Sequence, residues 1–110
     1  MTTLEPGYLK HLYNIVESRK GLDPSESYIA QLFDKGSHKI AQKVGEEAVE
    51  TVIEAVAKDK NGIINESADL IFHWLILLAD QGITLEEIFA EMHRREGISG
   101  LTEKANRNKD

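Results

Sequence analysis

The chain has 110 residues, the usual size of one domain, and its 41% hydrophobic and 29% charged residues are typical of globular proteins. It has no cysteine, which excludes disulfides and thiolate metal sites and leaves oxygen or imidazole ligands for any metal. The net charge of −6 argues against a nucleic-acid partner, because phosphate backbones require a basic surface. The N-terminus has no signal-peptide pattern, and the longest apolar run, 70–79, is interrupted by His73 and too short to span a bilayer. We therefore expect a cytoplasmic protein with no membrane contact.

The first third of the chain predicts two helices. Apolar residues at helical spacing indicate a helix over about 5–19, and Pro6 suits its first turn. A loop rich in turn residues follows, and Ser25 or Ser27 could cap the next helix. That helix should be short, within 28–36, and should end at Gly36.

The rest of the chain predicts longer helices. One should run over about 37–58 and another over about 63–80, with Asn61 and Gly62 as the breaker between them. Thr84 and Glu87 have capping-box spacing, so a further helix should continue to about Arg95. A polar, glycine-containing tail occupies 95–110. No strand pattern is evident, and the prediction is one all-α domain over 1–110, a bundle of four to five helices.

The helix expected over 63–80 is unusually apolar. Between residues 68 and 79 only Asp69 and His73 are strongly polar, so apolar side chains cover nearly its whole circumference. A helix that is apolar all round must be buried all round, which a small monomer achieves with difficulty. We therefore expect a homodimer that completes the bundle, with this helix at or near the interface. The alternative is the central helix of a compact monomer.

The helix expected over 37–58 carries an acidic side. Glu47, Glu50 and Glu54 share one stripe, with Glu46 at its edge. Lysines continue that side toward the N-terminus, at Lys35, Lys39 and Lys43. A separate apolar face carries Ala41, Val44, Ala48, Val52 and Val56. A charged stripe of this kind is most often a solvated face with local ion pairs, so the pattern alone does not establish a site.

A second acidic pair strengthens the case for a site. Glu66 and Asp69 are three residues apart, so they share a helix face, and the two predicted helices are joined by a short turn. If these helices face each other, their carboxylates converge and repel until a cation neutralises them. Carboxylate oxygens without thiolates favour Mg²⁺ or Mn²⁺, and the neighbouring lysines suit phosphate oxygens. The pattern therefore indicates a metal–phosphate site.

The pattern EExxE followed by ExxD resembles the signature of the MazG-like all-α nucleotide pyrophosphohydrolases. The surrounding residues "SYIAQLFDKGSHKIAQKVGEEAVE", "ESADLIFHWLILLADQGI" and "RREGISGLTEKANR" resemble one family within it, the phosphoribosyl-ATP pyrophosphatases. The resemblance covers about residues 9–107. It implies hydrolysis of phosphoribosyl-ATP to phosphoribosyl-AMP and pyrophosphate, the second step of histidine biosynthesis, with Mg²⁺ as cofactor, a helical homodimer and a cytoplasmic setting. From the ligand chemistry, Mn²⁺ is a possible substitute for Mg²⁺.

The resemblance also implies roles for individual residues. The positions that match the metal-ligand acids are Glu47, Glu50, Glu66 and Asp69. Glu46 matches the leading acid of the signature, as ligand or base, and the general base would be Glu46 or Glu50. Lys35, Lys39 and Lys43 match basic positions that suit the substrate phosphates. Weaker candidates for substrate contact lie in the tail block, at Arg94, Arg95, Ser99, Lys104 and Arg107.

Some alternatives stay open. His73 could contact substrate or a ligand acid, or it could be a hydrogen-bonded core histidine, which is the interpretation we favour. Trp74 is more typical of a core residue than of a base-stacking surface. The enzyme could also act on another nucleotide, although the lysines and the tail argue against it. A non-catalytic acidic helical dimer is the other alternative.

Overall fold

The computed structural model describes residues 7–98 and 100–108, and within them the fold is all-α, as predicted. Those residues form six helices rather than four or five. Their bounds are α1 (Tyr8–Ser18), α2 (Tyr28–Lys35), α3 (Ser37–Val56), α4 (Lys60–Asp80), α5 (Leu85–Arg95) and α6 (Gly100–Asn108).

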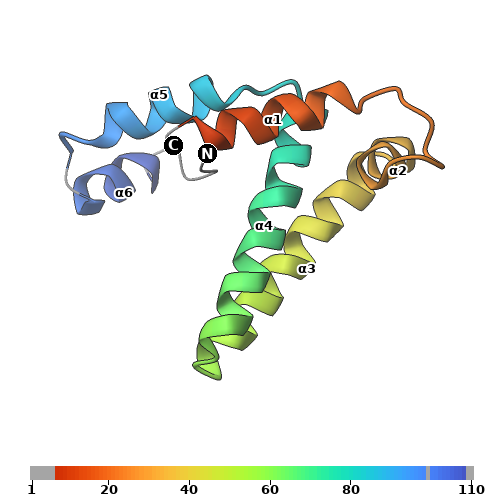
Figure 1. Cartoon of the computed structure of the whole chain (residues 1–110). Coiled ribbons are helices and arrows are strands. Elements are labelled where there is room, and N and C mark those ends of the chain that lie inside the picture. The colour runs from red at the N-terminus through yellow and green to blue at the C-terminus, as the bar shows by residue number, and fades with distance from the viewer. Residues whose placement is uncertain (1–6, 99, 109–110) are drawn as a thin grey trace.

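A long antiparallel hairpin of α3 and α4 dominates the molecule (Figure 1). α1 packs across the carboxyl-terminal end of α4, and α2 packs on α3. α5 lies beside α1 with α6 next to it, away from the turn that joins α3 to α4 (Figure 1). The end of the hairpin at the α3–α4 turn therefore projects from the rest of the chain (Figure 1). The acidic residues Glu47, Glu66 and Asp69 lie along the two helices of this hairpin.

The core sits where α1, α2 and the carboxyl-terminal half of α4 meet. Leu75, Ile76 and Ala79 of α4 are fully buried there. The other buried hydrophobic residues of this cluster are Tyr13, Val16, Ile29, Leu32, Ile40, Leu78 and Leu85. Burying so many large side chains supplies the main stabilisation of a chain this small, so this end of α4 is the anchored end.

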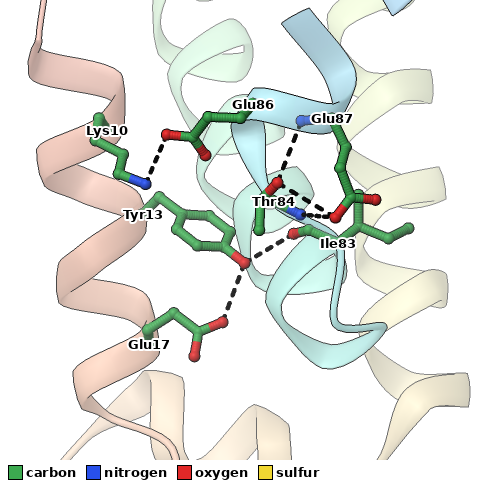
Figure 2. Close-up of polar contacts among 7 residues, drawn as sticks. All are labelled: Lys10, Tyr13, Glu17, Ile83, Thr84, Glu86 and Glu87. Carbon is green, nitrogen blue, oxygen red and sulfur yellow. Dashed lines mark hydrogen bonds and ion pairs between the residues drawn. The ribbon is translucent and has the colours of Figure 1, made fainter. Parts of the chain in front are cut away.

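Polar contacts fix α1 to the connection between α4 and α5 (Figure 2). The Tyr13 hydroxyl lies 2.7 Å from the Ile83 carbonyl oxygen and 3.0 Å from a carboxylate oxygen of Glu17. Burial, together with the hydrogen bond and charge of Glu17, raises the pKa of Tyr13 to about 12, so the phenol keeps its proton and donates it. The predicted capping box of Thr84 and Glu87 is confirmed and starts α5 directly after this contact.

The predicted breaker between the two long helices is wrong. Asn61 and Gly62 lie in the first turn of α4, because Asp59 caps the helix: its Oδ1 accepts the Gly62 N–H at 3.0 Å. Only residues 57–59 connect α3 to α4, and Lys58 adopts a left-handed φ of 59° there. The short connection holds the two acidic helices side by side.

Other boundaries agree more closely with the prediction. Ser27 caps α2 by accepting the Ala30 N–H, and Gly36, at a φ of 96°, ends it. The first helix begins at Tyr8 with Gly7 as its N-cap, later than predicted; Pro6 lies outside the described residues. The tail was not predicted to be helical, yet it contains α6.

The expectation that α4 is buried all round holds for only part of it. Leu75, Ile76 and Leu78 are buried within the chain, whereas Ile71 is 45% exposed. By length and composition alone α4 could cross a membrane, but a single such helix is weak evidence because core helices pass the same test. The buried carboxyl-terminal half of α4 behaves here as a core helix.

α3 turns its acidic side, not its apolar side, toward α4. Glu47 is only 6% exposed, whereas Val52 and Val56 of the apolar face are 60% and 78% exposed. Val49 and Ile53 are also exposed on α3. The hairpin therefore pairs carboxylates along its inner side and leaves an apolar surface outside, an arrangement that hydrophobic burial alone would not select.

Candidate metal centre

Three carboxylates converge between α3 and α4. Glu47 comes from α3 and Glu66 and Asp69 from α4, and one oxygen of each lies within 4.8 Å of the other two. Oxygens on opposite sides of a bound Mg²⁺ are about 4.2 Å apart, since each lies about 2.1 Å from the ion. The three oxygens are therefore close enough that small side-chain movements would bring all of them to one ion.

Two oxygens of this group lack partners. Within the described part of the chain, Glu47 Oε2 and Glu66 Oε2 are buried and accept no hydrogen bond. Buried polar atoms are almost always paired, and a buried carboxylate oxygen without a partner is costly. A hard divalent cation would satisfy both atoms and offset the charge, so the donor set fits such an ion.

The electrostatics show the repulsion expected of such a cluster. A hydrogen bond with Glu50, burial, and the charges of Glu50, Glu47 and Asp69 together raise the pKa of Glu66 to about 7. Burial and the charges of Glu50 and Asp69 raise the pKa of Glu47, against smaller opposing effects of His73 and Lys43. Both shifts disfavour the charged form of the carboxyl group, and a bound cation would reverse that preference.

The structure separates the two remaining acids of the EExxE motif. Glu50 is exposed, and its carboxyl group lies close enough to that of Glu66 to raise the pKa of Glu66, so it borders the three converging carboxylates. Glu46 is exposed and outside that group: it accepts a hydrogen bond from Gln42 at 2.7 Å and lies 3.4 Å from Lys43 Nζ. Those two contacts lower the pKa of Glu46.

The three candidate lysines follow one another along the chain from α3 back to α2, and Lys43 is the one nearest the carboxylates. Lys43 Nζ is 3.9 Å from Glu47 Oε1, so this lysine borders the carboxylates directly. Burial would lower the pKa of Lys43, but the hydrogen bond to Glu46 and nearby negative groups raise it overall, so it stays charged. Lys39 is half-buried on α3, and Lys35 is exposed at the end of α2.

His73 is a hydrogen-bonded core residue in this structure. It is 6% exposed, and its Nδ1 lies 2.7 Å from the backbone carbonyl oxygen of Asp69, which can only accept. Nδ1 therefore carries the proton, and Nε2 accepts from the Tyr28 hydroxyl at 2.9 Å. Both nitrogens are in use, which favours the core interpretation, and one of them holds the backbone of a candidate ligand.

The tail candidates are not brought to the carboxylates of the same chain. Glu91 lies 2.8 Å from both Arg94 and Arg95, and these pairs lower its pKa to about 2. α5 and α6 lie near the carboxyl-terminal end of α4, whereas Glu66 and Asp69 lie in its amino-terminal half (Figure 1). Lys104 and Arg107 are exposed on α6, and Ser99 lies outside the described residues.

One residue near the cluster was missed from the sequence. Tyr28 begins α2, is 46% exposed and contacts His73. The sequence feature that could have identified Tyr28 is its position directly after the capping Ser27, in the same segment as the lysines. Helical periodicity does not show which face of a helix an isolated aromatic residue occupies.

The raised pKa of Glu66 predicts how the metal-free protein responds to pH. The native state binds this proton more tightly than the unfolded state, so stability should fall as pH rises from about 4.5 to about 7. Glu66→Gln should reduce that fall and raise the melting temperature near pH 7 in EDTA, measured by circular dichroism. Mg²⁺ should stabilise the wild type more than the variant.

Glu26→Gln, which removes a charge from an exposed loop, is the control and should retain the wild-type fall. A variant at Glu66 that is less stable than the wild type in EDTA at pH 7 would contradict the repulsion described above.

Comparison with known proteins identifies the family. The family model described as phosphoribosyl-ATP pyrophosphohydrolase matches residues 9–96. Similar curated proteins, each named phosphoribosyl-ATP pyrophosphatase, include one from Rhizorhabdus wittichii, 54% identical over 94% of this chain and 97% of its own length. Another, from Zymomonas mobilis, is 52% identical over 92% of this chain and 94% of its own. The chain therefore belongs to the phosphoribosyl-ATP pyrophosphohydrolase family.

Proposed function

We propose that this chain is one domain over 1–110 that hydrolyses phosphoribosyl-ATP to phosphoribosyl-AMP and pyrophosphate, the second step of histidine biosynthesis, in the cytoplasm. The family and the names of its relatives support the reaction. The observation that carries it is the convergence of three carboxylates with two buried, unpartnered oxygens, which suits chemistry at a phosphoric anhydride.

The cofactor would be Mg²⁺, with Mn²⁺ as a substitute, held by Glu47, Glu66 and Asp69 with Glu50 beside them. Hard oxygen ligands and the absence of cysteine support this assignment. When bound, the ion supplies charge neutralisation for the triphosphate and makes water easier to deprotonate. The three carboxylates hold it on two packed helices joined by a short turn, so their positions change little.

Lys43, Lys39 and Lys35 would bind the phosphate oxygens that extend away from the carboxylates. Lys43 borders Glu47, and its charge is maintained by the acids around it. An ammonium group binds phosphate as a point charge, so lysines spaced along α2 and α3 can follow a flexible polyphosphate. The bond to be broken lies between the α and β phosphates.

Glu50 is the stronger candidate for the general base. It borders Glu66 and is exposed to water, so it can take a proton beside the phosphates. Glu46 is held by Gln42 and Lys43, and these contacts lower its pKa, which makes it a weaker base. Glu46 then acts on Lys43 and keeps this lysine beside the cluster.

The partner would be a second copy of this chain. The hairpin exposes large apolar side chains over both helices, and a monomer rarely leaves such a surface uncovered. Its members are Val49, Val52, Ile53 and Val56 of α3, with Ile64 and Ile71 of α4. A homodimer would cover this surface and complete the bundle around the hairpin.

Loss of a carboxylate ligand should abolish the reaction. In a coupled pyrophosphate assay with phosphoribosyl-ATP and Mg²⁺, Glu47→Gln and Asp69→Asn should each lower turnover by at least about 100-fold, because metal charge stabilisation contributes several kcal/mol. The helical circular dichroism signal should be unchanged. Near-normal turnover in either variant would rule out its ligand role, and release of pyrophosphate from ordinary nucleotides alone would indicate another substrate.

Kinetic measurements should distinguish Glu50 from Glu46 as the general base. Glu50→Gln should lower kcat by about 10²–10⁴-fold while the Mg²⁺ concentration for half-maximal rate stays similar. Glu46→Gln should have a much smaller effect, since Glu46 is not one of the converging carboxylates and its contacts with Gln42 and Lys43 lower its pKa. Recovery of the Glu50→Gln rate at high Mg²⁺ would show that Glu50 is a ligand instead.

The proposed interface predicts a change in oligomeric state. Val52→Glu places a charge on the apolar surface, so the mass measured by light scattering should fall from about twice 12.4 kDa to that of one chain. Met92→Glu on α5 is the matched control, because Met92 is also 60% exposed but lies outside the hairpin. A Val52→Glu protein that stays dimeric would place the interface elsewhere.

A further inference from the structure

Tyr28 presents an aromatic ring to solvent although its side chain is held from several sides. Its hydroxyl donates to His73 Nε2 at 2.9 Å, and its ring lies nearly parallel to that of Phe72, with centroids 6.3 Å apart and planes at 17°. The His73 ring meets it edge-on at 5.9 Å. Despite these contacts Tyr28 remains 46% exposed, so the ring is fixed while part of its surface stays open.

The ring lies at the edge of the candidate metal centre. His73, which accepts the Tyr28 hydroxyl, donates in turn to the backbone carbonyl of Asp69. On the opposite helix, Lys43 lies near enough to the Tyr28 phenol for the two to interact electrostatically, and it also borders Glu47. Tyr28 therefore neighbours both the part of α4 that carries Asp69 and Lys43, the lysine closest to the carboxylates.

We infer that the exposed face of Tyr28, backed by Phe72, is the surface on which the adenine base of the nucleotide stacks. This inference rests on the proposed function, which places the phosphates of an adenine nucleotide at the neighbouring carboxylates and lysines. Aromatic faces stack on any nucleobase, and a ring already held in place loses little conformational freedom on binding. Since the hydroxyl donates its proton to His73, Tyr28 cannot donate a hydrogen bond to the base, and we expect stacking to be its main contribution.

Trp74 is a poorer candidate for the same role. It is half-buried and packs against the hydrophobic core, so its face is committed to other side chains. Tyr8 is similarly exposed, at 40%, but it begins α1, which packs on the carboxyl-terminal end of α4 and not on the half that carries Glu66 and Asp69. Tyr28 combines exposure with a place beside the carboxylates.

The test compares ligands with and without a base. AMP and inorganic pyrophosphate with Mg²⁺ would be titrated into the protein by calorimetry, which does not depend on turnover. Tyr28→Leu should raise the Kd of AMP about 5-fold to 100-fold and change that of pyrophosphate less than about twofold. Tyr28→Phe keeps the ring and should stay within about threefold of the wild type for both ligands. Tyr8→Leu is the matched control and should change neither.

Several outcomes would overturn the inference, and each has a distinct meaning. Equal weakening of AMP and pyrophosphate in Tyr28→Leu would mean that Tyr28 acts through His73 on the carboxylates. An unchanged AMP affinity, or no AMP binding by the wild type, would mean that no base stacks on it. Loss of the dimer with unchanged affinities would mean that a second copy covers the ring. If the wild type releases no pyrophosphate from phosphoribosyl-ATP but Tyr28→Leu still weakens AMP, the proposed reaction fails and the stacking surface stands.

Discussion

Repulsion among the carboxylates between α3 and α4 is the constraint on which the rest of the structure depends. Glu47, Glu66 and Asp69 bring like charges within 4.8 Å, and two of their oxygens are buried without partners. This arrangement costs stability in the metal-free chain, because burial and like charge both oppose ionisation. It becomes favourable with a cation, so stability and metal binding are coupled in this fold.

The remainder of the molecule holds these charges together against their repulsion. The apolar core anchors the carboxyl-terminal half of α4, and the Tyr13 contact with the Ile83 carbonyl fixes that end to α1. Asp59 caps α4 and keeps the connection to α3 short. His73 donates a hydrogen bond to the backbone carbonyl oxygen of Asp69 and so helps to fix the position of this residue. The acidic side of α3 packs against α4, which leaves Val52 and Val56 of its apolar side exposed. The candidate site and the proposed dimer surface therefore both follow from which face of α3 packs against α4.

Much of the fold could be predicted because its signals are local. The helices follow from apolar spacing, and the capping box at Thr84 and the stop at Gly36 are short-range chemistry. The prediction that Asn61 and Gly62 break the chain between the two helices failed because Asp59, two residues earlier, caps α4. A glycine is tolerated in the first turn of a helix. α6 was missed because a short polar helix carries little apolar periodicity.

The sequence by itself determined that the chain is all-α and that two pairs of acids share helix faces, since helical spacing sets both. Only the tertiary structure decided which acids meet. Glu46 and Glu47 are neighbours in the chain, yet Glu47 joins the cluster, whereas Glu46 is exposed and contacts Gln42 and Lys43. Successive helical residues point about 100° apart, and the direction that faces α4 is set by packing between helices, which no local pattern specifies.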